Sequence, residues 1–143
     1  MNNSSVKNQV TNFVPDATVV VVNLRESARL PKIILSCKDL KGYGNFMIDS
    51  GSVINIIKLR NLNNVPIDVK DVLVLRGISK VSVRTIGSVV FTIVGKITKF
   101  HVVQDDVTIP SDRILGSEFL EDNRVILDYD KRELIGKYDN SIL

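Results

Sequence analysis

One carboxylate stands at the end of an apolar run in the stretch NFMIDSGSVINII, residues 45–57. Asp49 follows three apolar residues and precedes Ser50 and Gly51. A charge in such a setting is costly unless another group pairs with it. Two carboxyl groups in one site can cleave a peptide bond with water, because one removes a proton from the water and the other protonates the substrate. Asp49 is therefore a candidate catalytic group. The alternative for the triplet alone is an Asx-type turn, in which Asp49 caps its own backbone.

The sequence contains few residues that could support other kinds of catalytic chemistry, because it has one cysteine and one histidine. Cys37 is the only cysteine, which excludes a disulfide within these residues and a cysteine-rich zinc site. His101 is the only histidine, so a Ser-His-Asp, Cys-His or His-rich metal site would depend on it. It lies in the strand-like run ITKFHVV, where we expect a surface or structural role. We therefore expect no metal and no cofactor.

The composition suits one compact globular domain. The sequence has 143 residues, of which 44% are hydrophobic and 24% charged. The net charge of +3 is mild, and no basic stripe with interleaved aromatic residues accompanies it, so a nucleic-acid partner is not expected. No apolar run is long enough to cross a bilayer, and the N-terminus shows no secretory signal. We expect no membrane partner.

The elements that would position Asp49 are mostly strands. Val- and Ile-rich runs alternate with turns that contain Gly or Asp, which predicts an all-β domain with one short helix. We expect three hairpins before the end of the chain and one at the end, at 31–49, 71–85, 87–103 and 124–136. Residues 52–64 carry a short strand or one helical turn, 113–116 a short strand that ends in Gly, and 117–123 a short helix capped by Ser117.

The two ends of the sequence are expected to lie outside the main domain. Residues 1–29 are interpreted as a flexible leader or linker, within which ATVVVVNL, residues 17–24, forms a strand outside the main fold or at an interface. Residues 30–137 form the domain, and 138–143 are a C-terminal tail.

Three stretches in a fixed order resemble a known family. FMIDSGS is followed by LRGISKVSVRTIGSVVFTI and then by ILGSEFL. This combination of an apolar strand with Asp-Ser-Gly, a hairpin, and two apolar residues with Gly before a short helix resembles the retropepsins. These are the aspartic proteases of retroviruses and LTR retrotransposons. ILG-x-x-FL followed by NRVILDYDKREL looks most like the gypsy-type elements, and the match covers about residues 30–136.

The resemblance implies a role for each matching residue. Asp49 would be the catalytic aspartate within an active-site loop that also holds Ser50, Gly51 and Ser52. The hydroxyl of Ser50 would form a hydrogen bond across the subunit boundary, and Gly51 would offer its backbone to the substrate. The tip of the flap, a hairpin that closes over the peptide, would hold Gly77, Ile78 and Ser79. The substrate pocket would be lined by Met47, Ile114, Leu115 and Gly116.

The resemblance also implies a small closed β-barrel that works as a homodimer. The sequence contains one Asp-Ser-Gly triplet, so the second carboxylate is expected from Asp49 of another copy across a two-fold axis. At about 3 Å two carboxylates cannot both ionise and share one proton. The expected activity is cleavage of a retroelement polyprotein, in the cytoplasm or in a virus-like particle. The alternative is a catalytically inactive module for dimerisation or peptide binding.

Overall fold

The computed structural model describes residues 17–22, 32–35, 37–42, 44–78, 80–93, 95–128, 130–131 and 133–136. Most of the predicted leader, all of the predicted tail, and Ser79 of the predicted flap lie outside these ranges. Within them the chain forms strands with one α-helix and one 3-10 helix. In chain order these are β1 (Thr18–Val21), β2 (Lys32–Leu35), β3 (Gly44–Ile48), β4 (Ile56–Lys58), η1 (Leu59–Asn61), β5 (Leu73–Arg76), β6 (Val83–Arg84), β7 (Gly87–Ile93), β8 (Lys96–Val103), β9 (Arg113–Leu115), α1 (Ser117–Asp122), β10 (Val125–Asp128) and β11 (Glu133–Gly136).

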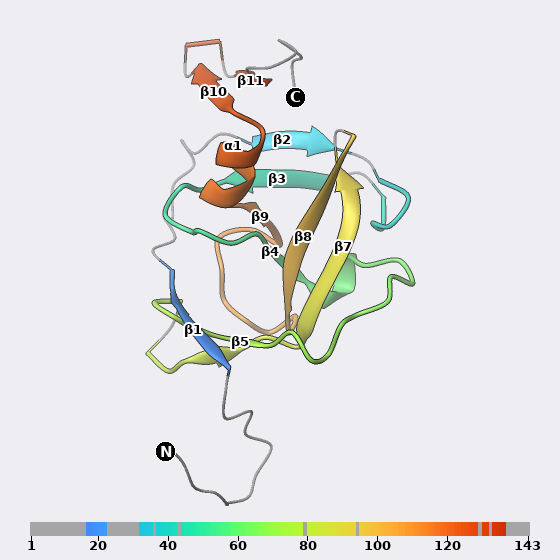
Figure 1. Ribbon diagram of the computed structural model, residues 1–143, viewed down its shortest axis with the longest axis vertical. Coiled ribbons are helices and arrows are strands. Elements are labelled where there is room, and N and C mark those ends of the chain that lie inside the picture. Colours follow the sequence, from blue (N-terminus) through green and yellow to red (C-terminus); the bar gives the residue numbers. More distant parts are fainter. Residues whose placement is uncertain are drawn as a thin grey trace, which may run out of the picture.

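The described strands form three sheets (Figure 1). The largest has the order β2-β3-β9-β4-β8-β7, a second has the order β1-β5-β6, and β10 pairs with β11. The predicted hairpins are confirmed, because β2–β3, β5–β6, β7–β8 and β10–β11 all pair antiparallel. Residues 52–64 contain both of the expected alternatives, since β4 runs directly into η1.

The sheet order differs from the predicted closed barrel. β2 and β7 stand at opposite ends of the six-stranded order, and no pairing between them closes a barrel among the described residues. Figure 1 shows the reason, because β7 and β8 run steeply across the direction of β2 and β3. Strands that cross in this way do not align as a ladder, and β2 and β7 come together near one corner, where the Sγ of Cys37, two residues after β2, lies 3.5 Å from the carbonyl oxygen of Thr92.

Two further expectations need correction. Of the two alternatives for the segment 17–24, a strand outside the main fold is wrong, because β1 pairs in parallel with β5, whereas a strand at an interface stays a prediction. Ser117 was expected to cap the helix, but it is the first helical residue, and the cap position belongs to Gly116, which has no side chain to form a capping bond. The backbone N–H groups of Ser117 and Glu118 instead donate to the carbonyls of Ser52 and Val53. That arrangement replaces a side-chain cap with contacts to the Asp49 loop.

The central strands bury both of their faces. In β3, Phe46 and Ile48 pack in one apolar cluster, whereas Met47 packs in another. The same division separates Leu115 from Ile114 in β9, because successive side chains of a strand point to opposite faces. The first cluster is the main core, with Phe46 and Phe100 fully buried. The second lies toward β5 and is described below.

We predict that Phe100→Ala lowers the free energy of unfolding by about 3–5 kcal/mol, because a buried aromatic side chain leaves a cavity that the sheet cannot fill. Phe100 is fully buried, and its ring stacks on Phe91 with centroids 4.9 Å apart. Urea unfolding followed by circular dichroism measures the change. The matched control is Ile97→Ala on the same strand, where the side chain is 81% exposed and the expected change is below about 0.5 kcal/mol. Equal effects of the two substitutions would contradict the assignment of this core.

Candidate active site

The loop 49–55 leaves β3 and returns as β4, and β9 lies between these two strands. β3 pairs with β9 in parallel, and β9 pairs with β4 antiparallel. The N–H of Asp49 donates to the carbonyl of Leu115 at 3.0 Å, which continues the β3–β9 ladder into the loop. Asp49 is thereby fixed to β9, the strand that carries the predicted pocket residue Ile114.

The carboxylate of Asp49 is enclosed by its own loop. Asp49 is only 1% exposed, and its Oδ1 accepts a hydrogen bond of 2.8 Å from the N–H of Gly51. This bond belongs to the Asx-type turn that the triplet alone predicts. It is also compatible with catalysis, since a backbone donor on one oxygen holds the carboxylate in a fixed orientation. The neighbouring Ser50 is exposed, as a contact with a second molecule would require.

The far end of the loop is pressed against the start of α1. The hydroxyl of Ser52, which is fully buried, donates to the carbonyl of Ile54 at 2.7 Å. A Cβ built on Gly116 would lie 2.4 Å from the carbonyl oxygen of Ser52 and 2.3 Å from that of Ile54. No side chain fits at such distances from backbone atoms. Gly116 therefore permits the close packing of β9 against the loop that carries Asp49.

Asn55 holds the same junction from the side and was missed in the sequence. Its Oδ1 accepts from the N–H of Gly116 at 2.8 Å, and its Nδ2 donates to the carbonyl of Lys99 at 2.9 Å. The carbonyl of Asn55 accepts from the N–H of His101 at 2.9 Å. One buried amide thus connects the loop, β8 and the start of α1. The stretch SVINIIK contained the signal, because a polar residue inside an apolar run, like Asp49, must be buried with a hydrogen-bond partner.

The predicted pocket residues separate into two groups. Met47 and Ile114 lie in one buried cluster together with Ile54, Ile56, Leu73, Leu75, Val22 and Val103, and Ile78 packs against it. These side chains are packed together as a core, and we call the cluster the β5-side pocket because the family resemblance would place the substrate pocket here. Leu115, expected in the pocket, packs in the main core instead, because it follows Ile114 on the strand and faces the other way. Gly77 lies at the end of β5 with a φ of +95°, a conformation that suits glycine.

A buried arginine supports β9 from the main-core side. Arg113 is 4% exposed, and its Nε donates to Asn61 Oδ1 at 2.8 Å, while a terminal nitrogen donates to the carbonyl of Lys41 at 3.0 Å. Its guanidinium also lies 5.4 Å from the centre of the Phe46 ring. Burial lowers the pKa of Arg113. Arg113 therefore connects β9 to η1 by a hydrogen bond and does not belong to the β5-side pocket.

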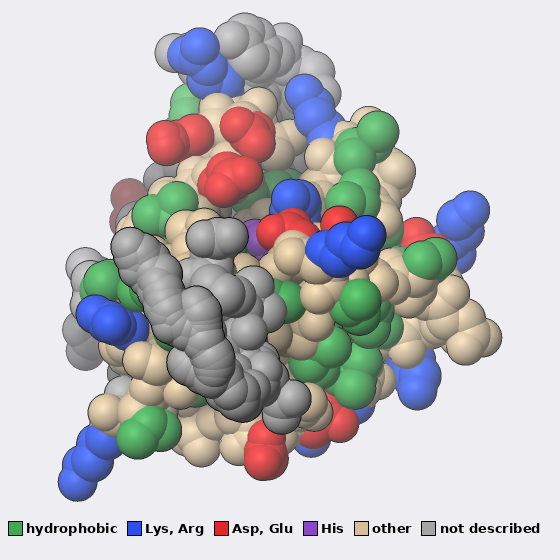
Figure 2. All heavy atoms as spheres, turned by 60° about the horizontal axis from the view of Figure 1, so that its bottom comes forward, with side chains coloured by type: hydrophobic (Ala, Val, Ile, Leu, Met, Phe, Trp, Pro, Cys, Tyr) green, Lys and Arg blue, Asp and Glu red, His purple; other side chains and the backbone are tan. Residues whose placement is uncertain are grey.

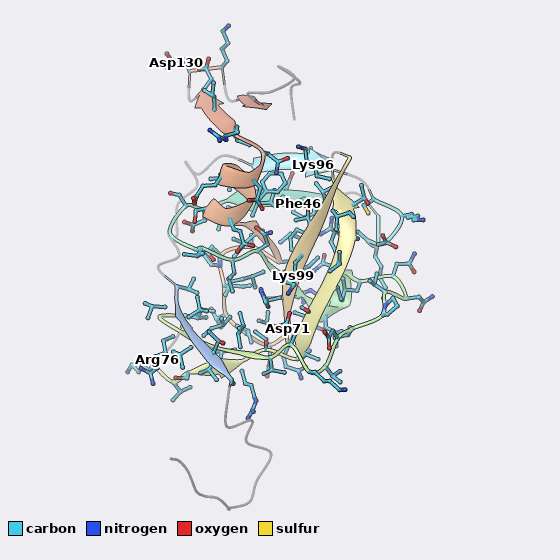
Figure 3. All side chains as sticks on the ribbon, viewed as in Figure 1. Phe46, Asp71, Arg76, Lys96, Lys99 and Asp130 are labelled. Atoms are coloured by element: carbon cyan, nitrogen blue, oxygen red, sulfur yellow. The ribbon has the colours of Figure 1, made fainter. Side chains whose placement is uncertain are left out.

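An ion pair joins Lys99 of β8 to Asp71, which precedes β5. The Nζ of Lys99 lies 2.8 Å from a carboxylate oxygen of Asp71, and Figure 3 shows the two side chains meeting between β8 and the start of β5. This bond lowers the pKa of Asp71 and raises the pKa of Lys99. Elsewhere on the face shown in Figure 2, basic and acidic side chains are interspersed. Within the described residues, no group of three His, Cys, Asp or Glu side chains could hold a metal ion.

Comparison with known proteins identifies the fold. No protein-family model and no curated protein sequence matches the chain. Among solved structures, the retroviral protease-like domain of Ddi1 from Leishmania major matches with a TM-score of 0.54. The sequences are 16% identical, and the match covers 80% of this chain and 94% of that domain. The chain has a retropepsin-like fold. Its described helix is too short to span a membrane.

We predict that Asn55→Ala destabilises this retropepsin-like fold by about 1–3 kcal/mol, because the buried N–H of Gly116 loses its acceptor. Urea unfolding followed by circular dichroism provides the measurement. The control is Asn63→Ala, since the side chain of Asn63 forms a single exposed bond to the carbonyl of Lys38 and its loss should change little. A result in which both substitutions are equally mild would contradict a bridging role for Asn55.

We also predict a loss of stability between pH 7 and pH 5 that depends on His101. Burial holds the pKa of His101 below its ordinary value of about 6.5, with Asp71 opposing the shift and Lys99 adding to it. The unfolded chain therefore takes up a proton first as the pH falls, and stability that is present above pH 6.5 is lost toward the lower pKa of the folded protein. Denaturant unfolding at several pH values measures this slope.

His101→Gln provides the comparison for the pH series. The glutamine does not titrate, so the slope between pH 7 and pH 5 should become flatter, while Asp71 contributes only at lower pH because its pKa is depressed. An identical slope in the two proteins would show that another group is responsible.

Proposed function

We propose that the chain is an aspartic endopeptidase of the retropepsin type that works as a homodimer. The observation that carries the proposal is the position of the single Asp-Ser-Gly triplet. It follows β3 directly, its carboxylate is buried and held by Gly51, and the fold around it is retropepsin-like. A stable homodimer would place two such loops at a two-fold axis, so that each protomer contributes one Asp49 to a single site.

The proposed chemistry uses both carboxyl groups of this pair. One Asp49, as the carboxylate, accepts a proton from a water molecule, whose oxygen attacks the carbonyl carbon of the peptide bond. The other Asp49, as the acid, gives its proton to the carbonyl oxygen. When the resulting diol collapses, the C–N bond breaks, the protonated carboxyl gives its proton to the leaving nitrogen, and the other carboxylate takes a proton from a diol hydroxyl as the new acid forms. Two products are released, an acid and an amine, and the pair again shares one proton.

The hairpin β5–β6 and the β5-side pocket would hold the peptide. Ile78, just after β5, packs on the same cluster as Met47 and Ile114. A pocket with these walls suits an apolar side chain of the substrate, because it offers burial without a polar partner. We propose that the substrate is a retroelement polyprotein, of a gypsy-type element by the sequence resemblance, and that cleavage occurs in the cytoplasm or in a virus-like particle.

A second function is a retropepsin-like module that dimerises or binds peptides without cleaving them. One observation favours it, since the β5-side pocket already holds Val22, the residue that follows β1. A pocket that is filled in this way can serve binding alone. The two functions share the fold and the pocket and differ only in whether Asp49 acts on a bound peptide.

We predict that Asp49→Asn reduces peptide cleavage by at least about 100-fold, since general acid–base catalysis by a positioned carboxyl group contributes roughly 10²–10⁴-fold. The measurement is cleavage of a peptide library between pH 4 and pH 7. The control is Asp106→Asn, an exposed residue of the 104–112 loop, which should cleave like the unaltered protein. An Asp49→Asn protein with full activity would overturn the assignment, and an unaltered dimer with no cleavage at any pH would support the binding module.

Mixing the two proteins tests whether the site is shared. After subunits exchange in an equimolar mixture with Asp49→Asn, random pairing leaves about half of the activity per unaltered protomer, because mixed dimers lack one carboxylate. Sedimentation velocity establishes that the mixture is dimeric. Activity that does not respond to the added variant would mean that one chain is sufficient.

A further inference from the structure

Val22 is a buried anchor that comes from outside the predicted domain. It follows β1 and is fully buried. Its N–H donates to the carbonyl of Arg76 at 2.7 Å, at the end of β5. In Figure 1, β1 lies alongside β5 and away from β3, the strand that Asp49 follows. The side chain of Val22 nevertheless lies in the same apolar cluster as Met47 and Ile114.

The cluster that contains Val22 includes a residue close to Asp49 in the sequence and a residue of the loop 49–55. Met47 precedes Asp49 by two positions and therefore lies on the same side of β3. Ile54 belongs to the loop itself, and Ile114 is paired with both Met47 and Ile56. All of these side chains are 6% exposed or less. The pocket that holds Val22 is thus built by the residues that would position a substrate beside Asp49.

Residues 18–22 have the form of a peptide bound to a sheet edge. β1 is the edge strand of its sheet and pairs only with β5 among the described strands, in the register Thr18↔Leu73 to Val21↔Arg76. Val20 and Val22 face the pocket, whereas Val19 and Val21 are 46% and 60% exposed. Backbone pairing with alternate side chains in pockets is the way in which extended peptides add to a sheet.

Gly77 of the predicted flap lies against the backbone of Val22. A Cβ on Gly77 would lie 2.1 Å from the carbonyl oxygen of Val22, a distance at which the strand would have to move. Gly77 also has a φ of +95°. The backbone of the predicted flap tip and the end of residues 18–22 are therefore in direct contact, as a flap and its peptide would be.

We propose that residues 18–22 are a resident ligand of the peptide site, and that the site takes extended peptides with a β-branched apolar residue in the position of Val22, which bind by displacing this segment. The inference rests on the proposed function for the identity of the site as a peptide site. To that function it adds two points. The pocket selects a β-branched apolar side chain, and residues 18–22 must leave the pocket before a peptide binds.

The test is binding of a fluorescein-labelled peptide with the sequence of residues 17–22, ATVVVV, followed by two lysines for solubility. Anisotropy is measured with the full chain carrying Asp49→Asn, so that no cleavage interferes. Val22→Asp should bind the peptide about tenfold or more tightly than the Val22 parent, because a carboxylate is expelled from the pocket and the fraction of open sites rises. Val21→Asp, on the exposed side of the same strand, should bind like the parent.

A Val22→Asp protein that is folded by circular dichroism and binds no more tightly than its parent overturns the proposal. So does a failure of the peptide to bind either protein. Equal gains for Val21→Asp and Val22→Asp would also overturn it, since that result would reflect a general loosening of β1 and not the emptied pocket.

If Val22→Asp fails to fold, hydrogen exchange of the unsubstituted chain provides a second test of displacement. Adding the peptide should accelerate exchange of the Val22 amide, which loses its bond to Arg76, while the amides of β8 remain protected. Unchanged exchange at a saturating concentration of peptide would contradict displacement. A peptide in which valine is replaced by aspartate at the last position is the negative control.

These results are separable from the fate of the proposed function. If the peptide binds and displaces residues 18–22 but no peptide is ever cleaved, the resident ligand stands and the enzyme assignment falls. If the unaltered chain and a Val22→Asp chain that keeps Asp49 cleave at the same rate, and the labelled peptide binds neither Asp49→Asn protein, the enzyme assignment stands and the resident ligand falls.

Discussion

The site depends on the contact between the backbone at Gly116 and the backbone of the loop that carries Asp49. β9 lies between β3 and β4, so the loop 49–55 must cross the end of β9. A Cβ at Gly116 would overlap the carbonyls of Ser52 and Ile54, and Asn55 closes the remaining gap with bonds to Gly116 and to Lys99. This packing holds the start of α1 against the loop, while the parallel pairing of β3 with β9 brings Ile114 opposite Met47 and fixes the N–H of Asp49 to Leu115.

The β5-side pocket is built like a hydrophobic core, because the strands that line it bury both of their faces. Strands with both faces buried have side chains in two layers, and in β3, β4 and β9 one layer packs under β7 and β8 while the other faces β5. Among the described residues, the second layer is covered by the hairpin β5–β6, by β1, and by Val107 and Ile109 of the 104–112 loop. An apolar layer that is covered by a hairpin, one strand and a loop can be exposed at lower cost than a layer under a continuous sheet. This arrangement is suited to a site that must admit a chain segment.

Local pattern was sufficient for most of the elements, and contacts between distant residues account for the errors. Alternation and turn residues located the hairpins and the short β9, and the order of three motifs pointed to the fold. Alternation also contained the correct position of Leu115, but the expectation followed the motif ILG as a unit and placed both apolar residues in the pocket. The role of Asn55, the closed contact at Gly116 and the pairing of β1 with β5 all join residues more than 40 positions apart. No pattern within a short window reports such distances.

The energetics of Val22 decide whether a resident segment is compatible with a working site. Burying one valine side chain contributes roughly 1.5–3 kcal/mol, which corresponds to about a 10- to 100-fold reduction in the apparent affinity of any competing peptide. A substrate that fills pockets in two protomers and pairs with two hairpins would gain several such contributions, whereas residues 18–22 pair with one hairpin and bury one side chain, that of Val22, completely. The segment is therefore strong enough to keep the apolar layer covered and weak enough to yield to a longer peptide. Such a balance depends on the size of the buried side chain, because Val22 is already fully buried in the cluster and a larger residue there would need space that the surrounding core occupies.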